Sequence, residues 1–288
     1  MKRCTVVGQV GRARRMTRMI GGLLGAVLSC GIAQAADGSG APRWEAGIAA
    51  GVGHVPDYPG ADRSRTRGIV LPMFIYRGPV LRIDQGGIRG RVLDSPNWEF
   101  DFSATGGFNA KDNAARDGMP PIDYLFGLGP QWVYKGLQSQ GSGPTLHLKL
   151  RAMMSTDMKR IDSRGFSIDP EVRWRLPGVA GTPATLSVSV QPTWASRALH
   201  RTFYQVDPSE ATAQRPAYRA RAGYLGTEVG ATLSHRMSRD LSWFVAARGM
   251  SLHGAANTDS PLLRERSQLS VGAGVVWTPW RSGASAAD

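Results

Sequence analysis

The stretch Thr145-Leu146-His147-Leu148-Lys149-Leu150-Arg151-Ala152 alternates apolar and polar side chains along most of its length. A period of two is that of a β-strand, in which successive side chains point to opposite faces. The same alternation recurs in residues 98–104, 166–176, 186–194 and 269–277, and a helical period is almost absent after residue 44. The pattern therefore predicts an all-β fold.

The length of these runs separates a soluble sheet from a membrane barrel. The runs last about ten to fourteen residues, whereas strands of soluble domains cluster near about five or six and a tilted membrane strand needs roughly nine to eleven. Lipid offers no partner to backbone amides, so a sheet that crosses a membrane must close on itself. We expect a closed antiparallel transmembrane β-barrel in contact with outer-membrane lipid. Aromatic side chains that could form interfacial girdles lie at or near run ends: Trp98, Trp132, Tyr134, Trp174, Trp194, Trp243, Trp277 and Trp280.

A membrane protein built of helices is excluded by composition. The mean hydropathy is −0.23, and no run of eighteen apolar residues occurs in the 288-residue chain.

About twelve strands are expected, an even number as in bacterial barrels. Gly86-Gly87 could be a turn inside the third run, so ten or fourteen strands also fit. The twelve runs are Arg43 to Gly53, Arg67 to Tyr76, Val80 to Val92, Asn97 to Asn109, Ile122 to Lys135, Thr145 to Thr156, Gly165 to Leu176, Ala184 to Ala195, His200 to Val206, Tyr218 to Arg236, Leu241 to Leu252 and Gln268 to Trp280.

Counting strands back from a periplasmic C-terminus assigns each connection to one side of the membrane. Asp207 to Ala217 and His253 to Ser267 become extracellular loops. Met237 to Asp240, Arg77 to Pro79 and the long connection Ala110 to Pro121 become periplasmic. The three periplasmic segments are the candidate surface for a periplasmic partner.

The first thirty-five residues have the pattern of a secretory signal. A basic segment precedes the apolar run Met19 to Leu28, and Ala33-Gln34-Ala35 is a small-x-small cleavage site. The prediction is a signal peptide over residues 1–35 and a barrel domain over 36–288. A faint lipoprotein box at Cys30 is the competing interpretation, and both cysteines of the chain, Cys4 and Cys30, lie in this segment.

The net charge of +13 loses most of its meaning once this segment is set aside. Six of the 35 basic residues lie in the first 18 positions, so 29 remain against 22 acidic residues, a net charge of +7 without a block of like charges. A nucleic-acid partner is not expected.

Several segments distributed over nearly the whole chain after residue 36 have a recognisable sequence. They are Gly51 to Asp62 (GVGHVPDYPGAD), Leu71 to Tyr76 (LPMFIY), Gly86 to Gly90 (GGIRG), Tyr124 to Pro130 (YLFGLGP), Thr202 to Val206 (TFYQV), Ala217 to Ala220 (AYRA) and Asp259 to Leu262 (DSPL). Together these segments resemble the MipA/OmpV family of MltA-interacting proteins of the outer membrane.

The resemblance implies a non-enzymatic barrel in the Gram-negative outer membrane. Such a protein would be a scaffold that holds a murein lytic transglycosylase near a peptidoglycan synthase. A narrow pore for small solutes is the alternative, because a barrel's function follows loosely from its fold.

No catalytic, cofactor-binding or metal-binding residue is predicted. Ser251 and His253 suggest a hydrolase pair, but no acid or oxyanion device accompanies them. The five histidines, His54, His147, His200, His235 and His253, show no metal-ligand spacing.

Pro56 to Gly60 is expected to be a rigid structural turn, with a partner epitope as the second interpretation. Nine charged residues are expected to line the lumen, where they would form either a pore constriction or salt bridges with one another. They are Glu99, Asp101, Lys149, Arg151, Asp169, Glu171, Arg173, Arg175 and Arg248.

Overall fold

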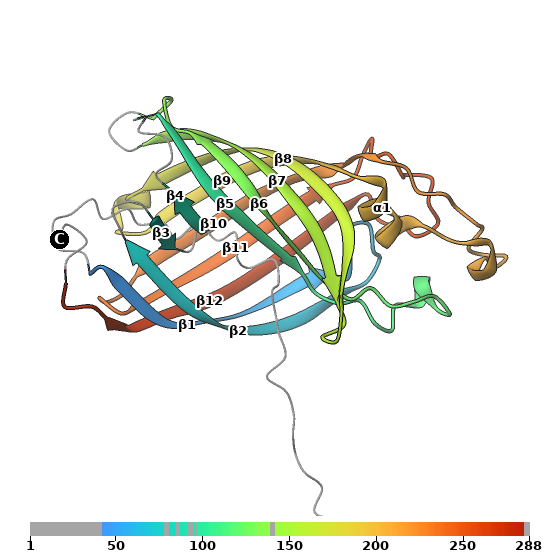
Figure 1. Ribbon diagram of the computed structural model, residues 1–288, viewed down its shortest axis with the longest axis horizontal. Helices are drawn as coiled ribbons and strands as arrows, with labels where there is room; N and C mark the ends of the chain where they lie inside the picture. Colours follow the sequence, from blue (N-terminus) through green and yellow to red (C-terminus); the bar gives the residue numbers. More distant parts are fainter. Residues whose placement is uncertain are drawn as a thin grey trace, which may run out of the picture.

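A computed structural model describes residues 42–77, 81–84, 87–90, 95, 97–138 and 142–284, so the expected signal peptide lies outside the described residues. Within these ranges ten strands have ten or more residues, and two short strands form a hairpin between β2 and β5 (Figure 1). The strands are β1 (Trp44–Pro56), β2 (Ser64–Arg77), β3 (Leu81–Asp84), β4 (Gly87–Gly90), β5 (Trp98–Gly107), β6 (Tyr124–Tyr134), β7 (Gly143–Thr156), β8 (Ile161–Pro177), β9 (Thr185–Ala195), β10 (Gly223–Arg236), β11 (Leu241–Ser251) and β12 (Ser267–Arg281).

Helical structure among the described residues is confined to the connections. One α-helix, α1 (Arg197–Tyr204), follows β9, and three 3₁₀ turns are η2 (Ala114–Arg116), η3 (Val179–Gly181) and η4 (Pro208–Glu210). No helix in the described part of the chain is long and apolar enough to cross a membrane.

Every strand pairs with its neighbours in antiparallel fashion, which confirms the all-β antiparallel prediction. The order of neighbours is β1-β12-β11-β10-β9-β8-β7-β6-β5-β4-β3-β2, and β1 pairs with both β12 and β2. The weakest part of this order is the short hairpin, where β2 and β3 share two residue pairs and β4 and β5 share three.

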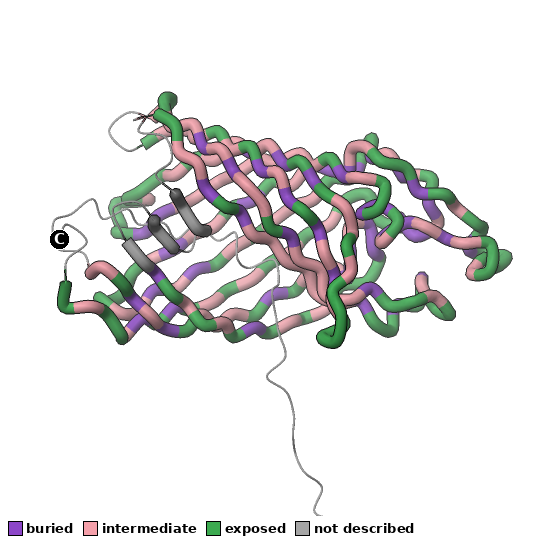
Figure 2. The backbone as a smooth tube through the Cα atoms, in the orientation of Figure 1, coloured by how far each residue is buried: buried purple, intermediate pink, exposed green. Residues whose placement is uncertain are grey.

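Burial changes from residue to residue along the strands, as the bands in Figure 2 show. The exposed positions carry large apolar side chains, and many of the buried positions on the strands carry polar ones. On β7, Leu148 is 42% exposed while its neighbours Lys149 and Arg151 are buried. Eight apolar residues of the alternating runs follow this pattern. Trp98, Phe102, Leu146, Leu148 and Val271 are exposed, and Phe100, Val188 and Val190 are half-buried.

The described connections gather at two ends with different character. At what we call the capped end, segments 57–63, 108–123, 196–222 and 252–266 pack together. The turn 157–160 and helix α1 also lie at this end (Figure 1). At the opposite turn end lie segments 135–138, 178–184 and 237–240, with the start of β1 and the end of β12.

Two of the twelve predicted strands are wrong. The run Val80 to Val92 contains the hairpin β3–β4, in which Asp84 pairs with Gly87. The run His200 to Val206 overlaps helix α1, because Leu199 and Phe203, and likewise His200 and Tyr204, are four residues apart and share its buried face. Ser196 caps this helix, its Oγ accepting from the Leu199 amide at 3.4 Å.

Because of these two errors, every connection between the hairpin β3–β4 and helix α1 lies at the opposite end of the barrel from the one predicted. Ala110 to Pro121 was expected at the same end as Met237 to Asp240, but it lies at the capped end, where Arg116 donates to the Phe203 carbonyl at 3.1 Å. It therefore cannot share a partner surface with Met237 to Asp240. Arg77 ends β2 at the turn end, as expected, and Gly78 and Pro79 lie outside the described residues.

Candidate functional site

The inner wall formed by β7, β8 and β9 carries a buried network of charges. The ammonium of Lys149 forms an ion pair with Glu171 and donates to Oε1 of Gln191 at 2.7 Å. Glu171 also receives two bonds from the guanidinium of Arg173, at 3.0 and 3.1 Å. Lys149 and Glu171 are 3% and 4% exposed, so each charge depends on the other for its stability.

A second ion pair lies beside the first, toward the capped end. Nη1 of Arg151 lies 3.0 Å from Oδ2 of Asp169, and its Nε donates to the Ser103 hydroxyl at 2.6 Å. The hydroxyls of Ser167 and Thr193 each donate to Asp169 at 2.7 Å. The predicted salt-bridge pairing of lumen charges is confirmed for these groups. Among the other predicted lumen charges, Glu99 pairs with Lys135, Asp101 contacts Gln131 at 3.4 Å, and Arg248 lies 3.8 Å from Glu228.

The turn Pro56 to Gly60 lies in the centre of the capped end. Asp57 is almost fully buried and contacts Arg65 at 3.1 Å and Arg67 at 3.6 Å, and it accepts from the Asn113 amide at 2.9 Å. These contacts hold segments 57–63 and 108–123 together. The turn is structural, as predicted, and its burial argues against the interpretation as an exposed epitope.

Tyr58 ties the same turn to the last loop of the chain. Its hydroxyl donates to the Leu262 carbonyl at 3.0 Å, and burial raises the pKa of this phenol to about 12, so it remains a donor at neutral pH. Gly60 has φ +88°, and a Cβ atom there would lie 2.8 Å from the side chain of Leu263. The residue must be glycine both for its conformation and for this close approach.

Helix α1 is fastened to the capped end through a fully buried histidine. Nδ1 of His200 lies 2.9 Å from Nδ2 of Asn257, and its Nε2 lies 3.1 Å from the Gly223 carbonyl. The Asn257 amide cannot turn over, because Oδ1 accepts from the Arg221 amide at 2.8 Å and Nδ2 donates to the Arg221 carbonyl at 2.9 Å. His200 must therefore accept at Nδ1 and carry its proton on Nε2, which requires a neutral ring. Burial lowers its pKa.

Sequence analysis did not identify Asn257 or Arg215 as important. Arg215 is buried and donates to the carbonyls of Ala115, Asp117 and Glu210, at 3.1, 2.9 and 2.7 Å. Both residues stand in polar, turn-rich segments of ordinary appearance. Their roles depend on contacts with distant parts of the chain, which no local pattern reveals.

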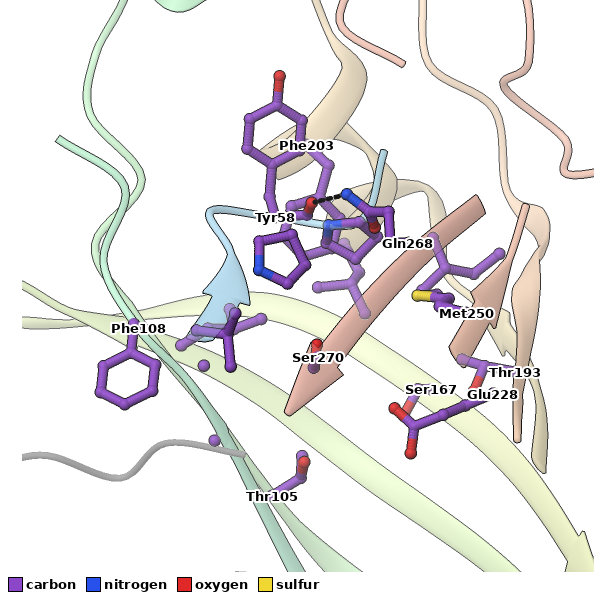
Figure 3. A pocket seen from close by; sticks show the side chains of 18 of the residues that line it. Tyr58, Thr105, Phe108, Ser167, Thr193, Phe203, Glu228, Met250, Gln268 and Ser270 are labelled. Carbon is purple, nitrogen blue, oxygen red and sulfur yellow. Dashed lines mark hydrogen bonds between the residues drawn. The ribbon is translucent and has the colours of Figure 1, made fainter. Parts of the chain in front are cut away.

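A cavity of about 270 Å³ lies in the lumen beneath the cap (Figure 3). The apolar side chains on one side of it come mostly from the capped end. The polar side chains on the other side come mostly from the inner faces of β5 and of β7 to β12. Its apolar residues include Tyr58, Leu199, Phe203, Leu225 and Met250, and its polar residues include Asp169, Gln191, Thr193, Glu228, Arg248 and Ser270.

The remaining histidines do not meet at one place. His54 contacts Thr66, His147 contacts Thr145, and His235 lies against the ring of Trp243. No group of three possible metal-ligating side chains occurs in the described part of the chain.

Ser251 and His253 lie within hydrogen-bond distance, with Oγ of Ser251 3.2 Å from Nδ1 of His253. Both are exposed at the end of β11. A hydrolytic pair would normally use Nε2 toward the serine and a carboxylate at Nδ1. Here Nδ1 faces the serine, so the arrangement does not match that pattern.

Aromatic residues form a belt on the outer face, mainly near the turn end. Trp98 contacts Tyr134 with ring centroids 4.8 Å apart, and Trp277 contacts Trp280 at 5.9 Å. Near the capped end Trp194 contacts Tyr224 at 5.6 Å. The belt has the position and chemistry of an interfacial girdle.

Comparison with known proteins gives one family and one solved structure to report. The family model described as MltA-interacting protein MipA matches residues 48–279. The structure described as "NanC porin structure in rhombohedral crystal form" is similar over 80% of this chain and 98% of that chain, with 10% identity and a TM-score of 0.40. No curated protein matches the chain.

Proposed function

Because the chain belongs to the MltA-interacting protein MipA family, we propose that it is an outer-membrane scaffold that holds a murein lytic transglycosylase near a peptidoglycan synthase. Its membership in this family, over residues 48–279, is the observation that carries the proposal. In this proposal the chain is exported by a signal peptide over residues 1–35 and catalyses no reaction itself.

Residence in the membrane is supported by the outer face of the strands. Large apolar side chains there are between one third and two thirds exposed, a degree of exposure that a soluble protein seldom shows over such an area. We propose that twelve strands close into a barrel, with the hairpin β3–β4 completing the wall between β2 and β5. Outward-facing examples are Val52, Val70, Phe74, Phe102, Leu128, Leu148, Phe166, Val245, Leu269 and Val275.

The lengths of the connections support one orientation. Outer-membrane barrels have short periplasmic turns and longer extracellular loops. The long segments 108–123, 196–222 and 252–266 share the capped end, whereas segment 237–240 at the turn end is a tight turn. We therefore assign the turn end to the periplasm and the capped end to the cell exterior.

The turn end offers a compact surface for a periplasmic partner. In the turn 237–240, Met237 is 64% exposed, and Arg236 and Arg239 add positive charge beside it. The turn is held in shape because the Ser238 hydroxyl accepts from the amides of Asp240 and Leu241, at 3.2 and 3.1 Å. An ordered turn presents these groups with little loss of conformational entropy on binding.

The proposal is tested by exchanging one exposed methionine at each end. Met237→Ser should weaken the capture of a purified lytic transglycosylase by the detergent-solubilised barrel, because an exposed apolar contact is lost. Met158→Ser is the matched control, since Met158 is 54% exposed in the short turn 157–160 at the capped end. Both variants should keep the heat-modifiable migration of a folded barrel. Equal capture by both variants would reject the turn end as the partner surface, and no capture by the unmodified protein would reject the scaffold.

A narrow pore for small solutes is the second candidate, favoured by the cavity in the lumen. Planar-bilayer recordings test it. Stable channel openings by the purified protein would support the pore, and their absence would leave the scaffold as the function.

A further inference from the structure

We propose that the cavity beneath the cap binds a small, uncharged aromatic molecule of about the size of indole. This site is independent of the proposed scaffold function, because it lies under the capped end, whereas a transglycosylase would contact the turn end.

The apolar part of the cavity lining is rich in aromatic rings and thioethers. The rings of Tyr58, Phe108 and Phe203 line the cavity, together with the side chains of Met153 and Met250. Figure 3 shows Phe203 and Tyr58 on one side of the space. Aromatic rings pack favourably edge-to-face or offset against another ring, and a methionine sulfur makes a favourable contact with the edge of a ring. An aromatic ligand can form both kinds of contact, which a saturated ligand of similar size cannot.

The charged groups that line the cavity are paired within the protein. Among the described residues five charged side chains line it, and each of them forms an ion pair with another side chain of this protein. The nitrogen–oxygen distances are 3.0 Å for Arg151 with Asp169, 3.8 Å for Glu228 with Arg248, and 3.1 and 3.6 Å for Asp57 with Arg65 and Arg67. A charged ligand would have to compete with these pairs and would also lose its own hydration. An uncharged ligand avoids both costs.

Hydroxyl groups in the lining can bind one polar group of such a ligand. Thr105 on β5 and Ser270 on β12 both line the cavity. Ser270 stands between Leu269 and Val271, which are exposed on the outer face, so its own side chain points into the lumen. A hydroxyl can rotate either to donate or to accept a hydrogen bond. The N–H or O–H group of a small aromatic molecule therefore has a partner here that carries no charge.

The volume of the cavity sets the size of the ligand. A wholly apolar cavity of about 150 Å³ is large enough to bind benzene. This cavity has a volume of about 270 Å³, which is below the roughly 300–1,000 Å³ of pockets for drug-sized molecules. The ligand that fits between these limits has about two fused rings, as indole has.

The test is isothermal titration of the purified full-length protein in detergent with indole, corrected by a titration of detergent alone. Two charged probes, indole-3-carboxylate and 3-(aminomethyl)indole, test the requirement for an uncharged ligand. Cyclooctanol, which is uncharged and saturated, tests the requirement for an aromatic ring.

A cavity-filling variant and a matched control locate the binding site. A Cβ atom at Gly107 would meet only Leu125, at 3.6 Å, which is an ordinary contact, and both residues line the cavity. The leucine side chain of Gly107→Leu should therefore extend into the cavity. Gly249→Leu is the control, because a Cβ atom at Gly249 meets no atom within 4 Å and the residue lies opposite the exposed Leu269 on the outer face. Both variants should keep the heat-modifiable migration of a folded barrel.

We expect indole to bind saturably to the unmodified protein and to Gly249→Leu with equal affinity, and to bind Gly107→Leu at least about tenfold more weakly. The charged probes should bind the unmodified protein at least about tenfold more weakly than indole, and cyclooctanol at least about threefold more weakly. The proposal is wrong if indole does not bind, if folded Gly107→Leu binds it unchanged, or if a charged probe or cyclooctanol binds as well as indole. The comparison of probes uses the unmodified protein alone, so it decides the question even if Gly107→Leu fails to fold.

Discussion

Asn257 should control the opening of the cap, because its side chain joins three separate segments. It makes four hydrogen bonds: two with the Arg221 backbone, one with His200 and one with the Tyr218 hydroxyl, at 2.8 to 3.3 Å. The residue is completely buried. Replacing it with alanine removes all four bonds and leaves their partners unsatisfied in the interior. At about 0.5–1.5 kcal/mol for each bond, the expected loss is about 2–6 kcal/mol.

The loss should appear as local opening and leave the barrel folded, since the strands keep their own hydrogen bonds. Trypsin reports such opening, because cleavage after Arg201 in helix α1 requires the helix to unwind. A loss of about 1.4 kcal/mol changes an opening equilibrium tenfold. The Asn257→Ala variant should therefore be cut after Arg201 at least about tenfold faster than the unmodified protein, as followed by mass spectrometry of the fragments.

Gln214→Ala is the matched control, because Gln214 is an exposed amide in the same connection. It should leave the cleavage rate unchanged, and the heat-modifiable migration should be normal in both variants. Equal cleavage rates for Asn257→Ala and the unmodified protein would refute the role of Asn257 in closing the cap.

Three further predictions concern the cap and the barrel wall. Burial lowers the pKa of His200. The neutral ring therefore stabilises the cap fully above the pKa of about 6.5 in the unfolded chain, and this stabilisation is lost as the pH falls below that value. Tryptic cleavage after Arg201 should accelerate from pH 7.5 to pH 5.5, and the His200→Asn variant should show a flatter pH dependence. Leu148→Arg should destabilise the folded barrel by about 2–4 kcal/mol if the site is near the bilayer midplane, measured by urea unfolding in lipid vesicles, whereas Leu148→Met should change it little. Gly274→Ala should lower stability by about 1–3 kcal/mol, because the new Cβ would lie 2.6 Å from Phe244 and from a backbone oxygen, whereas Gly249→Ala meets no atom within 4 Å and should be neutral in the same assay.

The barrel wall could be predicted from the sequence because the environment of each residue depends on a local pattern. Leu148 faces outward and Lys149 inward, and this difference follows from adjacency in the chain alone. The pairing of Lys149 with Glu171 was also within reach, since both face inward on neighbouring strands. Which of these charges pair with each other depends on register, which the pattern does not specify.

The cap could not be predicted because its stabilising contacts join distant parts of the chain. Tyr58 donates to the carbonyl of Leu262, 204 residues away, and Asp57 is bonded by Asn113, 56 residues away. Helix α1 has only eight residues, and in so short a segment period two and period 3.6 are hard to separate. A strand was therefore expected where a helix lies.

The side of the membrane assigned to each connection was more sensitive to error than the strands themselves. Alternation has no direction, so one missed or extra strand reverses every later assignment until a second error restores it, as happened between the hairpin β3–β4 and helix α1. Connection length does not accumulate such errors, and the lengths of Ala110 to Pro121, Asp207 to Ala217 and His253 to Ser267 would have placed these three connections at one end. Long loops that share one end can bury apolar side chains against each other, which explains why Leu199, Phe203 and Leu263 belong to one core. The same core includes Met153 of β7 and Leu225 of β10, so the loops pack both on each other and on the strands beneath them. The cap is the part of the molecule that a strand count cannot describe.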